Sequence, residues 1–560
     1  MKAMSHPKSK RRFQFQALED RLTRAGDIAA SLQGGNLYIT EAAAQVGQDN
    51  GILISETAKG AIHIQGTAAS GTGAASLVNG AAYRDFVVPG SLFVSLGAGN
   101  DKVEFSSLGP TIKLQSVDLN VGPVSVATGV SDKDSVSVAN LQTSAGLSIE
   151  TGADDDTVYI GACQIGDYVG NDQLYIKTGA GADFVSLQGG SVAGSAFIQT
   201  YDALTENDVD TLYVDKNFVF HADANFSLGG GNDNVYLGDA SGSQGYEYSV
   251  EILDSLTLDT GTGDDTVSIY NASIGWSATN TTNILTGAGA DQVTINGPHT
   301  DLMNLNLLTY SYTSELDKDV VHIQSVTLGG SSAVRMGGGD DQFTSDVSDP
   351  SQPAAGTVIV GSLYVDMGAG NDTVNISALS DNINSSDTLT IHTGAGVDTV
   401  NVSSTHDLRN LTIYTYDSLS ESDADSVTIS DVYAHGAITV LLGGGNDYFF
   451  LTGGTYSFTN IFVDAGTGND RGYVYNAAAY SNFAINMGDG DDNLTVDSVF
   501  AHDLSLNGGN GFDKLGITPN ISAIDAVFES GWEQYNHFNS WQDAMRASAV
   551  INQNIGLSRV

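Results

Sequence analysis

Acidic side chains recur in this chain at one position of a short motif, Gly-x-Gly-x-Asp. Twelve copies keep both glycines and the aspartate, and a thirteenth has Asp154 in place of the second glycine. Carboxylates that stack along one edge repel one another, so such a row favours bound protons or cations. Ca²⁺ prefers hard oxygen ligands of this kind. We therefore predict calcium ligands at the aspartates that end the copies, which are Asp101, Asp156, Asp183, Asp233, Asp265, Asp291, Asp341, Asp372, Asp398, Asp447, Asp470, Asp492 and Asp513.

A second acidic motif, Glu-x-Asp-x-Asp, lies in three of the longer intervals between these copies. It contains no glycine and brings three carboxylates within five residues, so we expect it to be the densest local group of calcium ligands. A weaker match, residues 131–134, fills the interval between Asp101 and Asp156. The three triads are Glu206, Asp208 and Asp210; Glu315, Asp317 and Asp319; and Glu421, Asp423 and Asp425.

The spacing of the two motifs reveals a duplicated unit. Successive aspartates from Asp233 are separated by 32, 26, 28 and 22 residues, and those from Asp341 by 31, 26, 27 and 22 residues. A period of about 20 to 50 residues is typical of solenoids, in which each repeat contributes one layer. The chain therefore contains two copies of a four-turn unit.

Short apolar alternations flank each motif and predict the strands that position it. Leu256 and Leu258 precede one copy, and Val267 and Ile269 follow it. This period of two turns one face of each strand inward, while glycine permits the positive φ values of a tight corner. Turns of this length are too long for a two-stranded β-roll and suit a three-sided winding. We predict an all-β fold, a right-handed parallel β-helix with N- and C-terminal caps.

Four segments follow from this division. We expect a basic N-terminal export or targeting segment at 1–34 and capping β turns at 35–95, where the motif is absent. The repeat β-helix then covers 96–517. A C-terminal cap at 518–560 includes a helix-like stretch at 540–549.

The glycine motif resembles the calcium-binding nonapeptide of the hemolysin-type (RTX) family, Gly-Gly-x-Gly-x-Asp-x-U-x, where U is a large apolar residue. Residues 508–516 match every position, whereas Thr178 and Leu228 replace the first glycine elsewhere. The resemblance implies calcium at the corners. The family carries its nonapeptides in tandem, but here one copy occurs per turn, so its two-sided calcium stack is not expected as a whole.

The N-terminal stretch 11–25 resembles the short N-terminal motif of planctomycete extracellular proteins, a basic lead followed by Leu-Glu-x-Arg. The resemblance implies an extracellular or cell-surface location. The alternative interpretation is a basic N-terminal arm.

Composition limits the partners. The chain has 560 residues and a formal net charge of −45, which should repel nucleic acid and attract cations. The lone Cys163 excludes an intrachain disulfide and a thiolate zinc cluster. No apolar stretch approaches the roughly 18 residues that a membrane helix requires, so we expect no membrane insertion.

Three alternatives stay open. Each aspartate could instead cap its corner by accepting backbone N–H bonds, without a metal. Polysaccharide lyases and glycoside hydrolases need paired carboxylates beside a basic or histidine partner, but the paired aspartates here recur with the repeat, so we expect no enzyme. Outward tyrosines and threonines could bind surface glycans or other surface proteins, and we expect a structural or adhesive role.

Overall fold

The computed structural model describes most of the chain between residues 26 and 537. The described residues are 26–42, 47–69, 74–87, 90–122, 132–169, 172–239, 248–311, 315–346, 357–381, 388–418 and 421–537.

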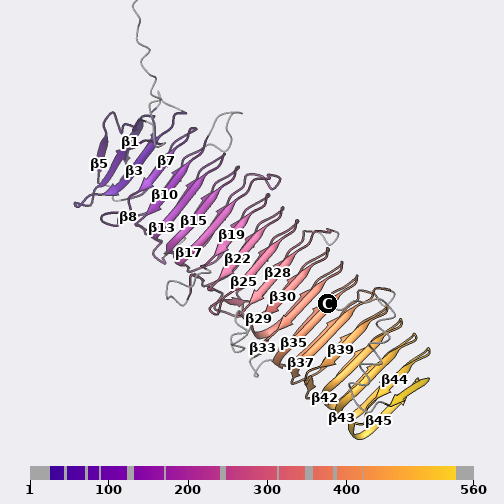
Figure 1. Ribbon diagram of the computed structural model, residues 1–560. Coiled ribbons are helices and arrows are strands. Elements are labelled where there is room, and N and C mark those ends of the chain that lie inside the picture. The colour runs from indigo at the N-terminus through magenta and orange to yellow at the C-terminus, as the bar shows by residue number, and fades with distance from the viewer. Residues whose placement is uncertain are drawn as a thin grey trace, which may run out of the picture.

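These residues form 46 strands that wind as an elongated parallel solenoid (Figure 1). The colours of Figure 1 follow one another along the rod, from β1 and β5 at one end to β44 and β45 at the other, because each turn stacks on the one before. The predicted all-β parallel β-helix is therefore confirmed. Within the described residues, no helix is long and apolar enough to span a membrane.

Each turn contributes to three faces. The first face follows the corner aspartate. It contains β3 (Gly51–Glu56), β7 (Lys102–Phe105), β10 (Ser135–Ala139), β13 (Thr157–Ile165), β15 (Phe184–Val192), β17 (Thr211–Phe220), β19 (Asn234–Leu237), β22 (Thr266–Tyr270), β25 (Gln292–Asn296), β28 (Val320–Gln324), β30 (Gln342–Asp346), β32 (Thr373–Ser377), β35 (Thr399–Leu408), β37 (Ser426–Ala434), β39 (Tyr448–Thr452), β42 (Arg471–Asn486), β43 (Asn493–Asn507), β44 (Lys514–Ile517) and β46 (Gln534–His537).

The second face uses the later parts of the long strands β13, β15, β17, β35, β37, β42 and β43. It also contains β8 (Ile112–Leu114), β11 (Leu141–Thr143), β20 (Val250–Ile252), β23 (Ala272–Ile274), β26 (Asp301–Met303), the first part of β29 (Thr327–Arg335) and of β31 (Val358–Asp366), β33 (Ser380–Asp381), β40 (Tyr456–Ser457) and β45 (Ser522–Ser530).

The third face leads into the corner aspartate and shares the ends of β29, β31, β42, β43 and β45. Its other strands are β2 (Asn36–Glu41), β6 (Leu92–Ser95), β9 (Val117–Asn120), β12 (Leu147–Glu150), β14 (Leu174–Lys177), β16 (Ala196–Gln199), β18 (Ala224–Ser227), β21 (Leu256–Asp259), β24 (Thr282–Leu285), β27 (Leu305–Leu308), β34 (Thr388–His392), β36 (Asn410–Tyr414), β38 (Ile438–Leu441) and β41 (Ile461–Asp464).

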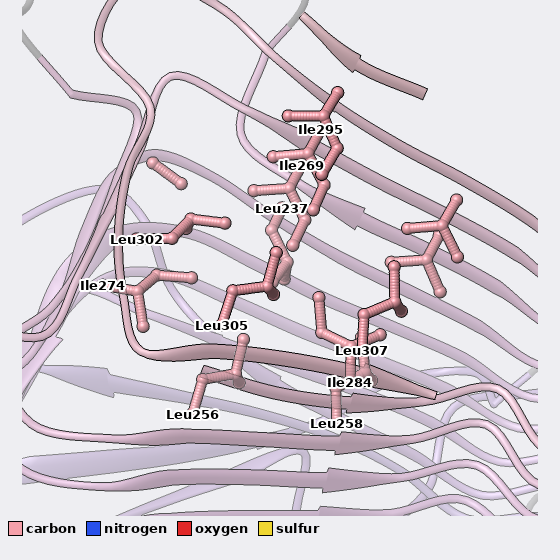
Figure 2. Close-up of a cluster of buried hydrophobic side chains, with 14 of the residues drawn as sticks. Leu237, Leu256, Leu258, Ile269, Ile274, Ile284, Ile295, Leu302, Leu305 and Leu307 are labelled. Carbon is pink, nitrogen blue, oxygen red and sulfur yellow. The ribbon is translucent and has the colours of Figure 1, made fainter. Parts of the chain in front are cut away.

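The core consists of aliphatic rows in strict register. Leu237, Ile269 and Ile295 stack on the first face, and Figure 2 shows them above the row formed by Ile284 and Leu307 of the third face. All five side chains are fully buried, and each such burial stabilises the fold by about 1.5–3 kcal/mol. The register of these rows fixes which residues meet at the corners.

A further corner, between the first and second faces, places non-glycine residues in the left-handed region. Asn140, Asn271 and Asn476 have φ values of 55°, 48° and 56° there. Asparagine tolerates this conformation better than most residues. The sequence pattern did not reveal this corner.

Antiparallel hairpins cover the N-terminal end. β1 (Ile28–Gln33) pairs with β2, and β4 (Ile62–Gly66) pairs with both β3 and β5 (Tyr83–Phe86). Such pairing hides the edge from which another chain would extend the sheet.

At the other end, β45 and β46 extend the sheets beyond residue 517, so the winding continues past the predicted boundary. The expected helix at 540–549 and the N-terminal motif at 11–25 lie outside the described residues.

Candidate functional site

The corner aspartates form one continuous hydrogen-bonded row, here called the ladder. The backbone N–H of Asp233 donates to Oδ1 of Asp265 at 2.7 Å, and that of Asp265 donates to Oδ1 of Asp291 at 2.9 Å. The row begins at the N–H of Asn50 and ends at Oε2 of Glu533. Its 17 members are Asp101, Asp134, Asp156, Asp183, Asp210, Asp233, Asp265, Asp291, Asp319, Asp341, Asp372, Asp398, Asp425, Asp447, Asp470, Asp492 and Asp513.

Glycine is required at the corner for two reasons. Gly261 and Gly263 have φ values of 97° and 128°, which side chains rarely adopt. A Cβ on Gly263 would also lie 1.9 Å from the carbonyl oxygen of Gly231 in the preceding turn. Asp154, which replaces a second glycine, accepts a φ of 78° instead.

An outer row runs in the opposite direction along the same edge. It consists of the exposed residues that immediately precede ladder aspartates. Oδ1 of Asn232 accepts the N–H of Asp264 in the following turn, and Oδ1 of Asp264 accepts that of Ala290, both at 3.0 Å. Asn371 likewise accepts from Val397. The successive N–H groups of 264 and 265 are thus bound by side chains of the preceding and the following turn.

The ladder carboxylates are buried, and most have one oxygen without a partner. Every member is at most 3% exposed. In Asp265, Oδ2 accepts the hydroxyl of Thr260 at 2.5 Å, and Asp210 and Asp319 are bound in the same way by Thr200 and Thr309. In nine others, Oδ2 has no hydrogen-bond partner among the described residues: Asp101, Asp134, Asp233, Asp341, Asp372, Asp447, Asp470, Asp492 and Asp513. In Asp156, Asp183, Asp291 and Asp398, a threonine hydroxyl lies beside the carboxylate and lowers its pKa, as Thr260 does for Asp265.

Burial raises the pKa of these carboxyl groups. The pKa of Asp233 rises to about 7, that of Asp265 to about 8 and that of Asp183 to about 9, chiefly because the charged form loses its hydration. For Asp265, the carboxylates of Asp291 and Asp233 raise it further. An ionised ladder is therefore costly unless a proton or a cation compensates each charge.

The Glu-x-Asp-x-Asp triads spread over three separate positions. Asp210 joins the ladder, and Asp208 takes the place of the second glycine, since a Cβ on Gly231 would lie 1.5 Å from its carbonyl oxygen. Glu206 accepts the N–H groups of Asp202 and Ala203 in its own loop.

The aspartates of the other two triads repeat these positions. Asp319 and Asp425 lie in the ladder, Asp317 and Asp423 stand opposite second glycines of the next turn, and Glu421 accepts the N–H of Asp417 at 2.7 Å. Among the described residues, no group of three or more His, Cys, Asp or Glu side chains is placed to hold a metal ion. The triads therefore do not form the dense carboxylate clusters that their sequence led us to expect.

Sequence reasoning missed several members of this edge. Asp134 was recognised only as a weak corner, yet it lies within the ladder. The outer row was also missed, although Asn or Asp before the corner aspartate recurs in the motif, as at Asn232 and Asn371. Asn50 and Glu533 carry no motif and are recognisable only from the register of the terminal turns.

The chain was compared with protein families, curated proteins and solved structures. No protein-family model matches the chain, and no curated protein matches it. Among solved structures, the chain is similar to a hyperactive, Ca²⁺-dependent, β-helical antifreeze protein from an Antarctic bacterium. The identity is 20%, the match covers 60% of this chain and 83% of that chain, and the TM-score is 0.35.

Proposed function

We propose that this chain is a calcium-binding acidic β-solenoid whose corner carboxylates hold Ca²⁺ and stiffen the rod. Its role is structural or adhesive, at the cell surface or outside the cell, and it is not an enzyme. One observation carries the calcium assignment: a row of buried carboxylate oxygens, from Asp101 to Asp513, without hydrogen-bond partners among the described residues.

The donor set suits calcium. Most glycine corners offer an Oδ2 of a ladder aspartate without a hydrogen-bond partner, and the outer row adds an amide or carboxylate oxygen at many of them, as at Asn232 and Asp264. The carbonyl oxygen of Gly231 faces the α-carbon of Gly263 in the next turn, so it points along the edge. Ca²⁺ accepts six to eight such oxygens in flexible geometry, whereas Mg²⁺ demands a near-ideal octahedron. Calcium would supply the positive charge that the buried row lacks.

The remaining parts of the proposal come from composition and pattern. A net charge of −45 concentrates cations and disfavours binding to nucleic acid. The resemblance of residues 11–25 to an export motif supports a place outside the cell, where calcium sites can be weak and still be filled. Surface glycans or other surface proteins are the partners that an adhesive role would require.

Thermal unfolding tests the calcium assignment. A ligand that binds only the folded state stabilises it by about 2.7 kcal/mol per site at a hundredfold excess over Kd. We therefore expect Tm to rise when metal-free protein receives CaCl₂ and to fall again with EDTA, with a smaller response to MgCl₂. Equal Tm values in CaCl₂ and EDTA would contradict calcium binding.

A further inference from the structure

A groove of about 360 Å³ lies beside the glycine-corner edge, where the upstream four-turn unit meets the downstream one. Its side chains come from Tyr310, Arg335, Asp366, His392 and Asp417, which belong to five successive turns. At about 4.8 Å per turn, the groove extends roughly 19 Å along the rod. Its shape suits a chain-like ligand that lies parallel to the rod axis.

The alternation of corner types hollows out this groove. Glycine corners supply a floor without side chains at Gly337 and Gly368, between the bulkier triad corners that carry Tyr310 and Asp417. The side chain of Tyr310 packs directly on Gly337, where a Cβ would lie 2.6 Å from it. The floor of the groove is thus formed by the backbone of Gly337 and Gly368, which the stacking of successive turns holds in place.

One wall carries a fixed polar network around His392. Nδ1 of His392 lies 3.2 Å from Oδ1 of Asp366, and Nε2 lies 3.4 Å from Oδ1 of Asp417. The hydrogen bond with Asp366 is the main cause that raises the pKa of His392. The hydroxyl of Tyr364 donates to Oδ2 of Asp366 at 3.2 Å. Nε2 also lies 3.1 Å from the carbonyl oxygen of Tyr416, so the imidazole is held by Asp366 on one side and by Tyr416, with Asp417 close by, on the other.

Arg335 completes the wall on the adjacent turn. Its Nη1 donates to Oδ1 of Asn306 at 3.0 Å, and its guanidinium lies 5.8 Å from the ring centroid of Tyr364. Arg335, Asp366 and His392 occupy the same strand position in three successive turns of the third face. Their donors and acceptors therefore form a row along the groove.

The equivalent stretch of edge four turns earlier shows that the solenoid does not need these side chains. There Tyr201 packs on Gly229 just as Tyr310 packs on Gly337. At the positions equivalent to Arg335, His392 and Asp417, however, that stretch has Ser227, Leu285 and Ser311, while Asp259 matches Asp366. The groove therefore carries an arginine, a histidine and an aspartate that stacking does not require.

We propose that this groove binds a neutral glycan along the rod, through Asp366, Asp417, His392 and Arg335 and against the ring of Tyr310. A few fixed polar groups beside an aromatic ring are typical of specific small-ligand sites. Within the groove, two carboxylates face a guanidinium and an imidazole, so the guanidinium offsets part of the negative charge. The surrounding body is strongly acidic and repels polyanions. The inference rests on the adhesive part of the proposed function and assigns it a ligand class.

Isothermal titration calorimetry on the full chain in saturating CaCl₂ tests this. The neutral probes are laminarihexaose, cellohexaose and mannohexaose, and hexagalacturonate is the anionic probe. A triple variant, Arg335→Ser, His392→Leu and Asp417→Ser, gives these three positions the residues found four turns earlier. The control, Ser227→Ala with Asp259→Asn, alters only that earlier stretch.

We expect at least one neutral hexasaccharide to bind the wild type and the control equally, with at least tenfold weaker binding to the triple variant at unchanged Tm. Failure of all three to bind, equal binding to the triple variant, or tighter binding of hexagalacturonate would overturn the inference. Glycan binding without a Tm response to calcium would contradict the calcium assignment but leave the groove standing. Cleavage of a bound probe would contradict only the non-enzymatic role.

Discussion

The backbone N–H of Asp265 donates at 2.9 Å to Oδ1 of Asp291, which lies one turn further along the solenoid, while Oδ2 of Asp291 stays buried with only the hydroxyl of Thr286 nearby. The two oxygens of one carboxylate therefore have different roles. Oδ1 caps a backbone donor, as the metal-free alternative requires, and Oδ2 remains available to a cation. The two interpretations of the corner are compatible, and they predict different effects of the same substitution.

Asp291→Asn separates capping from metal binding. The amide oxygen can still accept the N–H of Asp265, but the negative charge is lost. We expect the variant to lose about 1–3 kcal/mol of stability in CaCl₂ and little or none in EDTA, where removal of a buried charge relieves repulsion. Denaturant unfolding in both buffers measures this difference.

The matched control is Asp264→Asn in the outer row, where Asn232 and Asn371 show that asparagine is native to the position. Because the amide keeps the outer-row oxygen and Asp264 is exposed, the change in stability should be much smaller than for Asp291→Asn in CaCl₂. Equal losses for Asp291→Asn in CaCl₂ and in EDTA would mean that the carboxylate acts only as a cap.

Stability of the metal-free protein should depend on pH in the direction opposite to ordinary acid denaturation. Burial raises the pKa of Asp233 to about 7, of Asp265 to about 8 and of Asp183 to about 9, against about 3.9 in an unfolded chain. The folded state then binds more protons than the unfolded state, so the free energy of unfolding falls as pH rises. This contribution is complete below about pH 4 and is lost as pH rises through 7 to 9.

Calorimetry at pH 5 to 9 checks this dependence. In chelator, Tm should fall across the series. In CaCl₂ the fall should be smaller, because calcium replaces the protons that the ladder releases, so the gain in Tm from calcium grows with pH. A metal-free Tm that rises through this window would show that the carboxylates are ionised and stabilised without a cation.

The sequence alone predicted the parts of this molecule that repeat. Alternation around residues such as Leu256 and Val267 predicted the strands, and the spacing of Asp233 and Asp341 predicted the duplicated unit. A periodic sequence pattern is enough there, because each turn packs against its neighbours in the same way.

The direction of each side chain could not be predicted in this way. Whether Asp265 points inward depends on which turn supplies its N–H partner, and that is a matter of register. The groove was missed for a similar reason: His392 and Asp417 belong to different turns, and neither lies in a motif. The contrast with Leu285 and Ser311 could have been found by aligning the two stretches, since Tyr310, Gly337, Asp366 and Gly368 match Tyr201, Gly229, Asp259 and Gly261.

Gly263→Ala tests whether stacking of glycine on glycine keeps the edge in register. The added Cβ would lie 1.9 Å from the carbonyl oxygen of Gly231, at a φ of 128°. Gly109→Ala is the matched control, because Gly109 has a φ of 105° but no atom within 4 Å of an added Cβ.

Backbone strain alone should destabilise each variant by about 1–2 kcal/mol, and the steric clash should add to this loss only at Gly263. Denaturant unfolding in CaCl₂ should therefore show a larger loss of folding free energy for Gly263→Ala than for Gly109→Ala. The increase in Tm on adding calcium should also be smaller for Gly263→Ala, because Gly231 and the adjoining ladder oxygens lose their alignment. Equal losses at the two glycines would mean that the close contact between turns does not hold the edge together.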